Sequence, residues 1–258
     1  MNIHEYGTGN ARCIVLIHPS LVMWDYFEYV IPLLENDFHL IIPALPGYDP
    51  EKKSDFSSVE TIARQLADQL LLKGVTEVEC MYGCSMGGSI VLRFLQDGLV
   101  PVHAAVADGA ITPYQLPWLL TRFIALKDFL LIEAGKVGGV RLLEKAFATD
   151  EYSDEDLQYV ADVLDMISAK TIWNTFDSCN NYAMPSPEQI RCGQLEYWCT
   201  GKEKKERKAD IAWMKRYLPQ TRFRVYENIG HAGMTLLEPE LFAREIRRII
   251  RESDTSGS

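Results

Sequence analysis

The sequence predicts an α/β protein, built as a doubly wound, mostly parallel sheet with an inserted helical cap. Short apolar runs bounded by turn residues alternate with segments whose apolar residues recur at three- and four-residue steps. This alternation breaks once, where helical patterns follow one another without a convincing strand. The 258 residues, 47% hydrophobic and 24% charged, suffice for one globular core with such an insertion.

Six apolar runs are predicted as buried strands, over residues 13–17, 40–45, 78–82, 104–107, 195–199 and 223–226. Helices are predicted over residues 24–34, 59–72, 85–96, 211–217 and 240–250. We therefore expect residues 1–111 and 190–250 to form the core and residues 112–189 to form the cap. Residues 251–258, which end in SDTSGS, are expected to be a disordered tail.

Composition excludes several classes of function. A formal net charge of −10 provides no basic field for nucleic acid. Residues 1–9 lack the features of a secretory signal, and no apolar stretch approaches the length of a membrane span, so we expect a cytoplasmic protein. The five histidines and six cysteines show no metal-ligand spacing, so no metal or other cofactor is expected. The expected partner is a small-molecule substrate, with the chain a monomer or a homodimer.

The clearest motif is Gly83-Cys84-Ser85-Met86-Gly87, which lies between a predicted strand and a predicted helix. A sharp turn there holds the serine in a strained conformation with its hydroxyl exposed, as the G-x-S-x-G motif requires. The amides at the start of the helix point at the same place, so the N–H of Met86 is a candidate oxyanion donor. The alternative nucleophile, Cys84, precedes the apex of the turn and should face the core.

This pattern resembles the α/β-hydrolase family, in its capped, serine esterase or lipase-like form, over nearly the whole chain. Residues 16–20, LIHPS, are similar to the strand and oxyanion loop of that family, and residues 45–48, LPGY, to the turn after its next strand. Residues 228–233, NIGHAG, resemble the loop that carries the catalytic histidine. The resemblance implies that Ser85 is the nucleophile and His231 its base; the alternative for His231 is a loop residue capping the next helix.

The oxyanion loop departs from the family pattern. Pro19 stands where the family usually has glycine, and proline has no N–H to donate. The resemblance makes Ser20 the equivalent donor, with Leu21 as the alternative, and the Ser20 hydroxyl could also contact an oxyanion. His18, in this family, is usually structural.

The third member of the triad is not evident from the sequence. The family position falls on Lys204, which cannot accept the Nδ1 proton of a histidine. Glu203 is the first choice and Asp108, at the end of a predicted strand, the second. Residues 201–208, GKEKKERK, also read as a solvated helix face with an ion pair from Glu203 to Arg207.

The predicted function is hydrolysis of a carboxylic ester or thioester of a small, apolar acyl group through an acyl-enzyme on Ser85. The alternatives are an acyltransferase, a carbon–carbon bond hydrolase, or a non-catalytic small-molecule-binding homologue. Anionic substrates are disfavoured unless Arg122 or Lys127 lines the entrance. An apolar acyl pocket, or only the core of the cap, is expected from Leu116, Trp118, Leu119, Phe123, Ile124, Phe129, Leu130, Leu131, Trp173 and Phe176.

Overall fold

The computed structural model describes residues 1–113, 116–139 and 153–256. Seven strands form one sheet in the order β1-β3-β2-β4-β5-β6-β7. Among the described strands β1 alone is antiparallel to its neighbour, β3, and all other neighbours are parallel. This confirms the predicted doubly wound, mostly parallel sheet. The strands are Asn2–Tyr6 (β1), Cys13–Ile17 (β2), His39–Ala44 (β3), Val78–Cys84 (β4), Val102–Asp108 (β5), Cys192–Thr200 (β6) and Arg222–Tyr226 (β7).

Helices cover both faces of the sheet. They are η1 (Trp24–Phe27), α1 (Ile31–Leu34), α2 (Val59–Leu72), α3 (Met86–Asp97), α4 (Trp118–Gly138), α6 (Asp154–Met166), α7 (Ala169–Asn181), η2 (Pro187–Gln189), α8 (Glu203–Glu206), α9 (Lys208–Tyr217), α10 (Met234–Leu237) and α11 (Pro239–Ser256). Within the described ranges, none of these helices is both long enough and apolar enough to cross a bilayer.

Two apolar clusters form the core, one on each face of the sheet. Because successive side chains of a strand point to opposite faces, Val15 and Ile17 pack in the cluster with α2 and α3, whereas Ile14 and Leu16 pack in the cluster with α1 and α11. Every one of these four strand residues is buried. The continuous apolar run of β2 therefore reflects burial on both faces.

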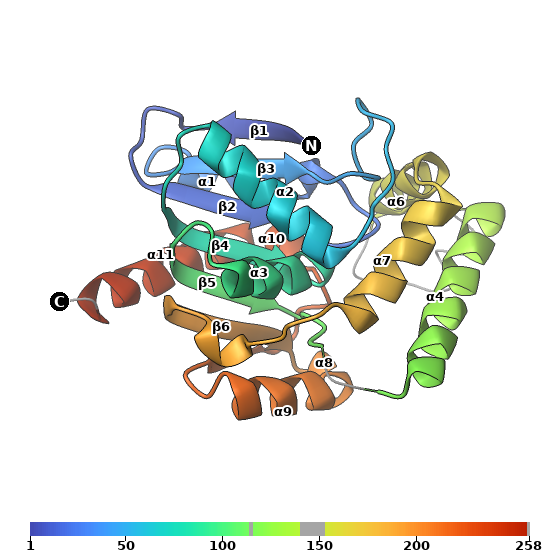
Figure 1. Cartoon of the computed structure of the whole chain (residues 1–258). Helices are drawn as coiled ribbons and strands as arrows, with labels where there is room; N and C mark the ends of the chain where they lie inside the picture. The colour runs from blue at the N-terminus through green and yellow to red at the C-terminus, as the bar shows by residue number, and fades with distance from the viewer. Residues whose placement is uncertain (114–115, 140–152, 257–258) are drawn as a thin grey trace.

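The segment between β5 and β6 contains α4, α6 and α7, and no strand among its described residues. Figure 1 shows these three helices gathered on the side of the sheet toward which the parallel strands point. That arrangement suits a cap over the carboxyl ends of the strands, where α/β proteins place their binding sites. The cap limits of 112–189 stay a prediction, and residues 114–115 and 140–152 lie outside the described residues.

Two sequence expectations near the N-terminus were wrong. Residues 24–34 form two short helices, η1 and α1, and α1 has Pro32 in its first turn. Proline lacks the N–H that a continuous helix would use, so it starts a new helix instead. The edge strand β1 was missed because its residues are only half-buried and show no apolar run.

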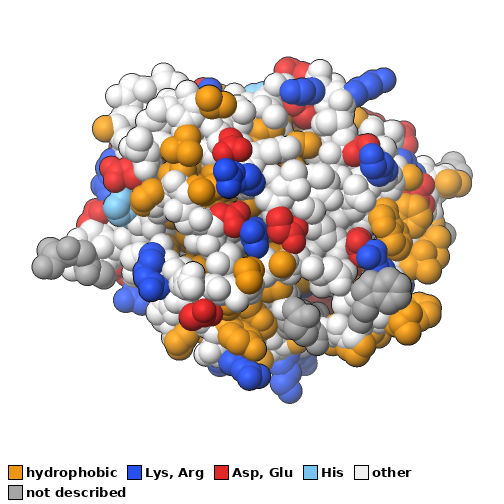
Figure 2. Space-filling model, in the orientation of Figure 1, with side chains coloured by type: hydrophobic (Ala, Val, Ile, Leu, Met, Phe, Trp, Pro, Cys, Tyr) orange, Lys and Arg blue, Asp and Glu red, His pale blue; other side chains and the backbone are white. Residues whose placement is uncertain are grey.

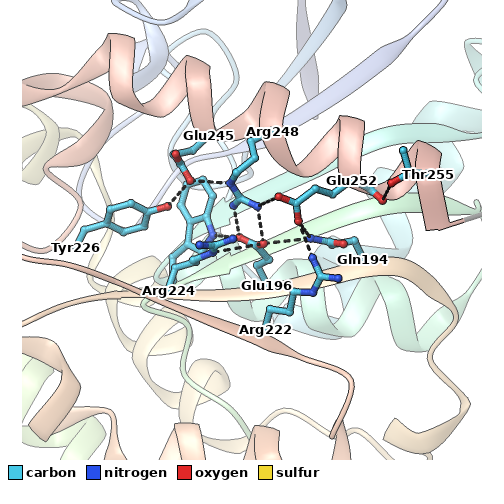
Figure 3. A network of polar contacts seen from close by, with 10 residues as sticks. Gln194, Glu196, Arg222, Arg224, Tyr226, Glu245, Arg248, Glu252 and Thr255 are labelled. Atoms are coloured by element: carbon cyan, nitrogen blue, oxygen red, sulfur yellow. Dashed lines mark hydrogen bonds and ion pairs between the residues drawn. The ribbon is translucent and has the colours of Figure 1, made fainter.

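The C-terminal helix also extends further than expected, because a polar network ties α11 to β6 and β7 (Figure 3). The fully buried carboxylate of Glu196 accepts hydrogen bonds from Arg248 at 2.7 Å and from the indole N–H of Trp198 at 2.7 Å. Glu252, inside the predicted tail, pairs with Arg248 at 3.0 Å and with Arg222 at 2.6 Å. The tail prediction is thus corrected for residues 251–256, while residues 257–258 lie outside the described part.

Candidate active site

Ser85 lies at the junction between β4 and α3, as the sequence predicts. Its backbone has φ 52°, in the left-handed region that non-glycine residues rarely adopt. The N–H of Ser85 donates to the carbonyl oxygen of Asp108 at 2.7 Å, which fixes the turn against the end of β5. A Cβ atom at Gly87 would lie 2.3 Å from the carbonyl oxygen of Ile17, so only glycine allows α3 to start this close to β2.

Cys84 faces away from this turn, into the core. It is fully buried in the cluster that contains Tyr82 and Phe242. Burial raises the pKa of its thiol well above the usual value, which disfavours the reactive thiolate. The alternative of a cysteine nucleophile therefore has no support from the geometry.

The structure brings Glu203 and His231 together, although they are distant in the sequence. The Nδ1 atom of His231 donates to Oε1 of Glu203 at 2.5 Å. The second carboxylate oxygen, Oε2, accepts the N–H of Thr200 at 2.9 Å. Burial raises the pKa of Glu203, but the hydrogen bond and charge of His231 together with the Thr200 bonds outweigh it and hold the pKa at about 2. Glu203 is therefore a charged acceptor that orients the imidazole and leaves Nε2 free.

The alternative reading of residues 201–208 as a solvated helix face is wrong at Glu203. Its side chain is only 6% exposed, whereas the side chain of His231 is 43% exposed. Arg207, the expected ion-pair partner of Glu203, contacts Asp210 instead, at 3.9 Å. Lys204, at the family-equivalent position, is exposed. Within α8, Glu203 is therefore buried, whereas the charged residues that follow it, Lys204, Lys205 and Glu206, are exposed.

Asp108 is close to this group but has a different partner. Its Oδ2 atom accepts the hydroxyl hydrogen of Tyr82 at 2.7 Å, and its backbone carbonyl holds the Ser85 turn. Burial and the nearby charge of Glu203 raise the pKa of Asp108 to about 6, against the lowering effect of the Tyr82 bond and of His231. Among the described contacts the hydrogen bond of His231 goes to Glu203, so Asp108 is placed to support the turn.

Gly109 is a site residue that the sequence reasoning missed. A Cβ atom there would lie 2.7 Å from Oε1 of Glu203 and 3.1 Å from Cε1 of His231, and the backbone has φ +54°. A side chain at this position would meet the Glu203–His231 pair directly. Gly109 also links the pair to Ser85, because it follows Asp108 in the chain. The signal was present as a glycine two residues after the predicted strand over residues 104–107.

We expect Gly109→Ala to lower kcat about 100-fold, because displacing a catalytic pair by an ångström costs that much. Gly98→Ala is the matched control: it has a similar φ, +59°, but a Cβ there would meet only the carbonyl oxygen of Leu95 at 3.9 Å. Both variants should lose about 1 kcal/mol of stability from the left-handed backbone. Steady-state kinetics and thermal melts separate the two effects, and equal losses of kcat in both variants would contradict the role of Gly109.

The candidate oxyanion loop follows β2. His18 is fully buried, and its Nδ1 donates to the carbonyl oxygen of Pro19 at 2.8 Å. Burial lowers the pKa of His18 to about 4, so the ring is neutral and structural, as the resemblance implies. Leu21 has φ 68°, an uncommon value for a branched residue and a sign that this loop is held in a specific conformation.

A pocket of about 500 Å³ opens beside His231. It brings together Ser20, Leu21, His231 and residues of α6. The described residues that line it do not include Ser85 or Met86, which lie at the strand-to-helix junction. Its full lining is Pro19, Ser20, Leu21, Val22, Asp25, Tyr26, Glu28, Tyr29, Glu155, Asp156, Leu157, Tyr159, Val160, His231, Ala232 and Leu236.

Two tyrosines that the sequence reasoning missed, Tyr26 and Tyr159, form hydrogen bonds between the segments that line this pocket. The hydroxyl of Tyr26 donates to the carbonyl oxygen of Ala232 at 2.7 Å, next to His231. The hydroxyl of Tyr159, on α6, donates to Asp25 at 2.5 Å and accepts the N–H of Met23 at 3.0 Å. Tyr159 therefore fastens the predicted cap to the core. Neither of these contacts could be predicted from the sequence, because Tyr26 and Tyr159 both lie in ordinary amphipathic patterns.

The cap residues proposed for an acyl pocket do not line this one. Leu119, Phe123, Leu130 and Leu131 of α4 are solvent-exposed, and none of the nine expected residues with described side chains lines the pocket, while the side chain of Trp118 lies outside the described part. Phe129 and Trp173 instead contact each other between α4 and α7, with ring centroids 5.8 Å apart. The apolar part of the pocket comes from α6, from the loop after β2 with η1, and from Ala232 and Leu236. Arg122 and Lys127 do not line it either.

Comparison with known proteins identifies the family. Residues 14–245 match the model of a family described as the alpha/beta hydrolase family. The chain belongs to the alpha/beta hydrolase family. It is also 32% identical over 95 residues to an uncharacterised hydrolase of Saccharomyces cerevisiae, a match that spans 35% of this chain and 33% of that protein.

Solved structures of alpha/beta hydrolases share this fold. A protein of Desulfitobacterium hafniense assigned to the same family superposes with a TM-score of 0.76 and 22% identity, over 96% of this chain and 100% of that one. A thermophilic esterase from Thermogutta terrifontis superposes with a TM-score of 0.74 and 15% identity, over 98% of this chain and 93% of that one. At these identities the likeness concerns the fold, and the chemistry must be argued from the site itself.

Proposed function

We propose that this alpha/beta hydrolase cleaves a carboxylic ester or thioester of a small, apolar acyl group through an acyl-enzyme on Ser85. The observation that carries the proposal is the 2.5 Å hydrogen bond from His231 to Glu203, beside a pocket and against Gly109, which follows the Asp108 carbonyl that holds the Ser85 turn. A buried carboxylate on Nδ1 holds the tautomer whose Nε2 accepts a proton. A thermophilic esterase is one of the solved structures that share this fold.

In the proposed reaction the Ser85 hydroxyl oxygen attacks the carbonyl carbon, and its proton moves to Nε2 of His231. Glu203, charged at a pKa of about 2, stabilises the imidazolium that forms. The backbone N–H of Met86 and that of Ser20, or of Leu21, donate to the oxyanion of the tetrahedral intermediate. His231 then gives the proton to the leaving alcohol or thiol, and water hydrolyses the acyl-serine by the same route.

The proposal is tested with the purified protein and a short-chain p-nitrophenyl ester. We expect turnover, with covalent labelling by a fluorophosphonate that the substrate slows by competition. Folded protein that neither turns over nor labels would refute the proposed hydrolysis. It would favour the non-catalytic binding alternative instead.

The charges that line the pocket predict a preference for neutral over anionic substrates. Its lining contains four carboxylates, from Asp25, Glu28, Glu155 and Asp156, and no lysine or arginine among the described lining residues. We expect kcat/KM for an anionic p-nitrophenyl hemisuccinate to be about tenfold below that of the neutral butyrate, because the field repels the anion. The gap should shrink in 1 M salt, where the screening length is about 3 Å, and in Glu28→Gln. Equal values for the two esters at low salt would contradict this electrostatic preference.

A further inference from the structure

The outward face of α4 is almost entirely apolar. Figure 2 shows hydrophobic side chains gathered over the region that α4 occupies in Figure 1. Phe123 is 67% exposed and Leu131 63% exposed, values that are unusual for large apolar residues of a globular protein. The stripe, as we define it, consists of Leu119, Leu120, Phe123, Leu126, Leu130, Leu131 and Val137.

The opposite face of α4 already has its partners. Ala125 is fully buried, and the side chain of Phe129 packs on Trp173 of α7. The Lys136 ammonium donates to the carbonyl oxygen of Ile167 at 2.7 Å. The stripe is therefore a second apolar face, separate from the one that joins α4 to the rest of the cap. None of its residues lines the pocket beside His231.

The stripe has the size of one side of a protein interface. With roughly 100 Å² exposed per side chain, it covers on the order of 700 Å². The largest apolar patch of a typical monomer is about 300–600 Å², whereas a stable complex buries about 800 Å² on each partner. Leaving such a face in water is costly, and a matching face on another chain would remove that cost.

The spacing of the stripe fits a second α4 helix. Leu119, Phe123, Leu126 and Leu130 follow one another at steps of four, three and four, the pattern of a two-helix seam. The helix dipole then favours the antiparallel arrangement. Antiparallel helices place the positive N-terminal end of each α4 beside the negative C-terminal end of the other, whereas parallel helices put like ends together.

We propose that this chain forms a homodimer through an antiparallel pair of α4 helices, with the two-fold axis close to Lys127. A lipid surface fits the stripe less well. Helices that lie on membranes carry many lysines and arginines on the polar side, whereas all three cations of α4 are already engaged: Arg122 with Asp177, Lys127 with Asp128 and Lys136 with Ile167. The proposal does not depend on the proposed hydrolysis.

The first test is the mass of the protein in solution, measured by sedimentation across a dilution series. Wild type should behave as two chains of 29.3 kDa, and Phe123→Glu should raise the dimer dissociation constant at least 100-fold. Leu72→Glu is the matched control, since Leu72 is 79% exposed at the end of α2 and should leave the dimer intact. Monomeric wild type, or a Phe123→Glu variant that stays dimeric, would overturn the proposal, as would monomers that bind neutral lipid vesicles.

The second test reads the orientation of the two helices. In the antiparallel pair, Lys127→Cys places two thiols next to the axis, and oxidation should give a disulfide-linked dimer on a non-reducing gel. Leu119→Cys places its two thiols about 24 Å apart along the helices, from the helical rise of 1.5 Å per residue, and should not cross-link. Wild type controls for the native cysteines, of which Cys192 alone is partly exposed. Cross-linking of both variants indicates parallel helices, and cross-linking of neither excludes the interface.

Discussion

Ser85→Ala is expected to lower kcat for a p-nitrophenyl ester by at least about 10⁴-fold, because the proposed acyl-enzyme forms on the Ser85 hydroxyl. The residual rate would come from binding and from the oxyanion donors. Steady-state kinetics measure the loss, and a thermal melt shows that the variant is folded. The proposal assigns the nucleophile to the residue at φ 52°, at the apex of the turn.

Cys84→Ala is the matched control, because Cys84 is adjacent in sequence but buried in the core. We expect its kcat to stay within about threefold of wild type, with some loss of stability from the smaller side chain. A large loss in Cys84→Ala together with an active Ser85→Ala would contradict the assignment. That outcome would point to chemistry on the thiol instead.

Glu203→Gln is expected to lower kcat by about 10²–10⁴-fold, since glutamine cannot stabilise the imidazolium that forms on His231. Asp108→Asn, at the runner-up position, should lower kcat less than about tenfold, because its carboxylate contacts Tyr82 rather than His231. The comparison of the two isosteric substitutions identifies the acid. If Asp108→Asn loses more kcat than Glu203→Gln, the proposed triad is wrong.

Stability against pH provides an independent readout for these two carboxylates. The pKa of Glu203, about 2, lies below its usual value, so its contribution to stability is present above pH 4.5 and is lost as the pH falls toward 2. The pKa of Asp108, about 6, lies above its usual value, so the folded state loses stability as the pH rises through 6. Asp108→Asn should therefore gain thermal stability relative to wild type as the pH rises from 3.8 to about 6, and should keep that gain at higher pH.

Much of the fold was predictable because strand and helix periodicities are local. The run over residues 78–82, followed by glycine-flanked Ser85 and an amphipathic helix, indicated the turn that the structure has at the start of α3. The half-buried β1 and the break before Pro32 were missed, because the first shows no apolar run and the second depends on a single residue. The alternation of strands and helices was still enough to identify the sheet.

The candidate site was predictable only in part, because its geometry is made by contacts distant in sequence. Glu203 and Lys204 are neighbours in a run of charged residues, and the sequence alone does not show which of them is buried. The fold buries Glu203 against His231. The importance of Gly109 depends on the side chains of Glu203 and His231, which approach it only in the folded chain. The exposed stripe of α4 was taken for a pocket wall or cap core, since periodicity shows that a helix has an apolar face but not what that face contacts.

The central claim is that Ser85 carries the acyl group, and a rapid acid quench during turnover of p-nitrophenyl acetate tests it most directly. Mass spectrometry of the quenched protein and of its peptides then locates the adduct. The account predicts one added acetyl group, on the peptide that contains Ser85, and none in Ser85→Ala. Turnover without any adduct, or an adduct on another residue, would contradict it.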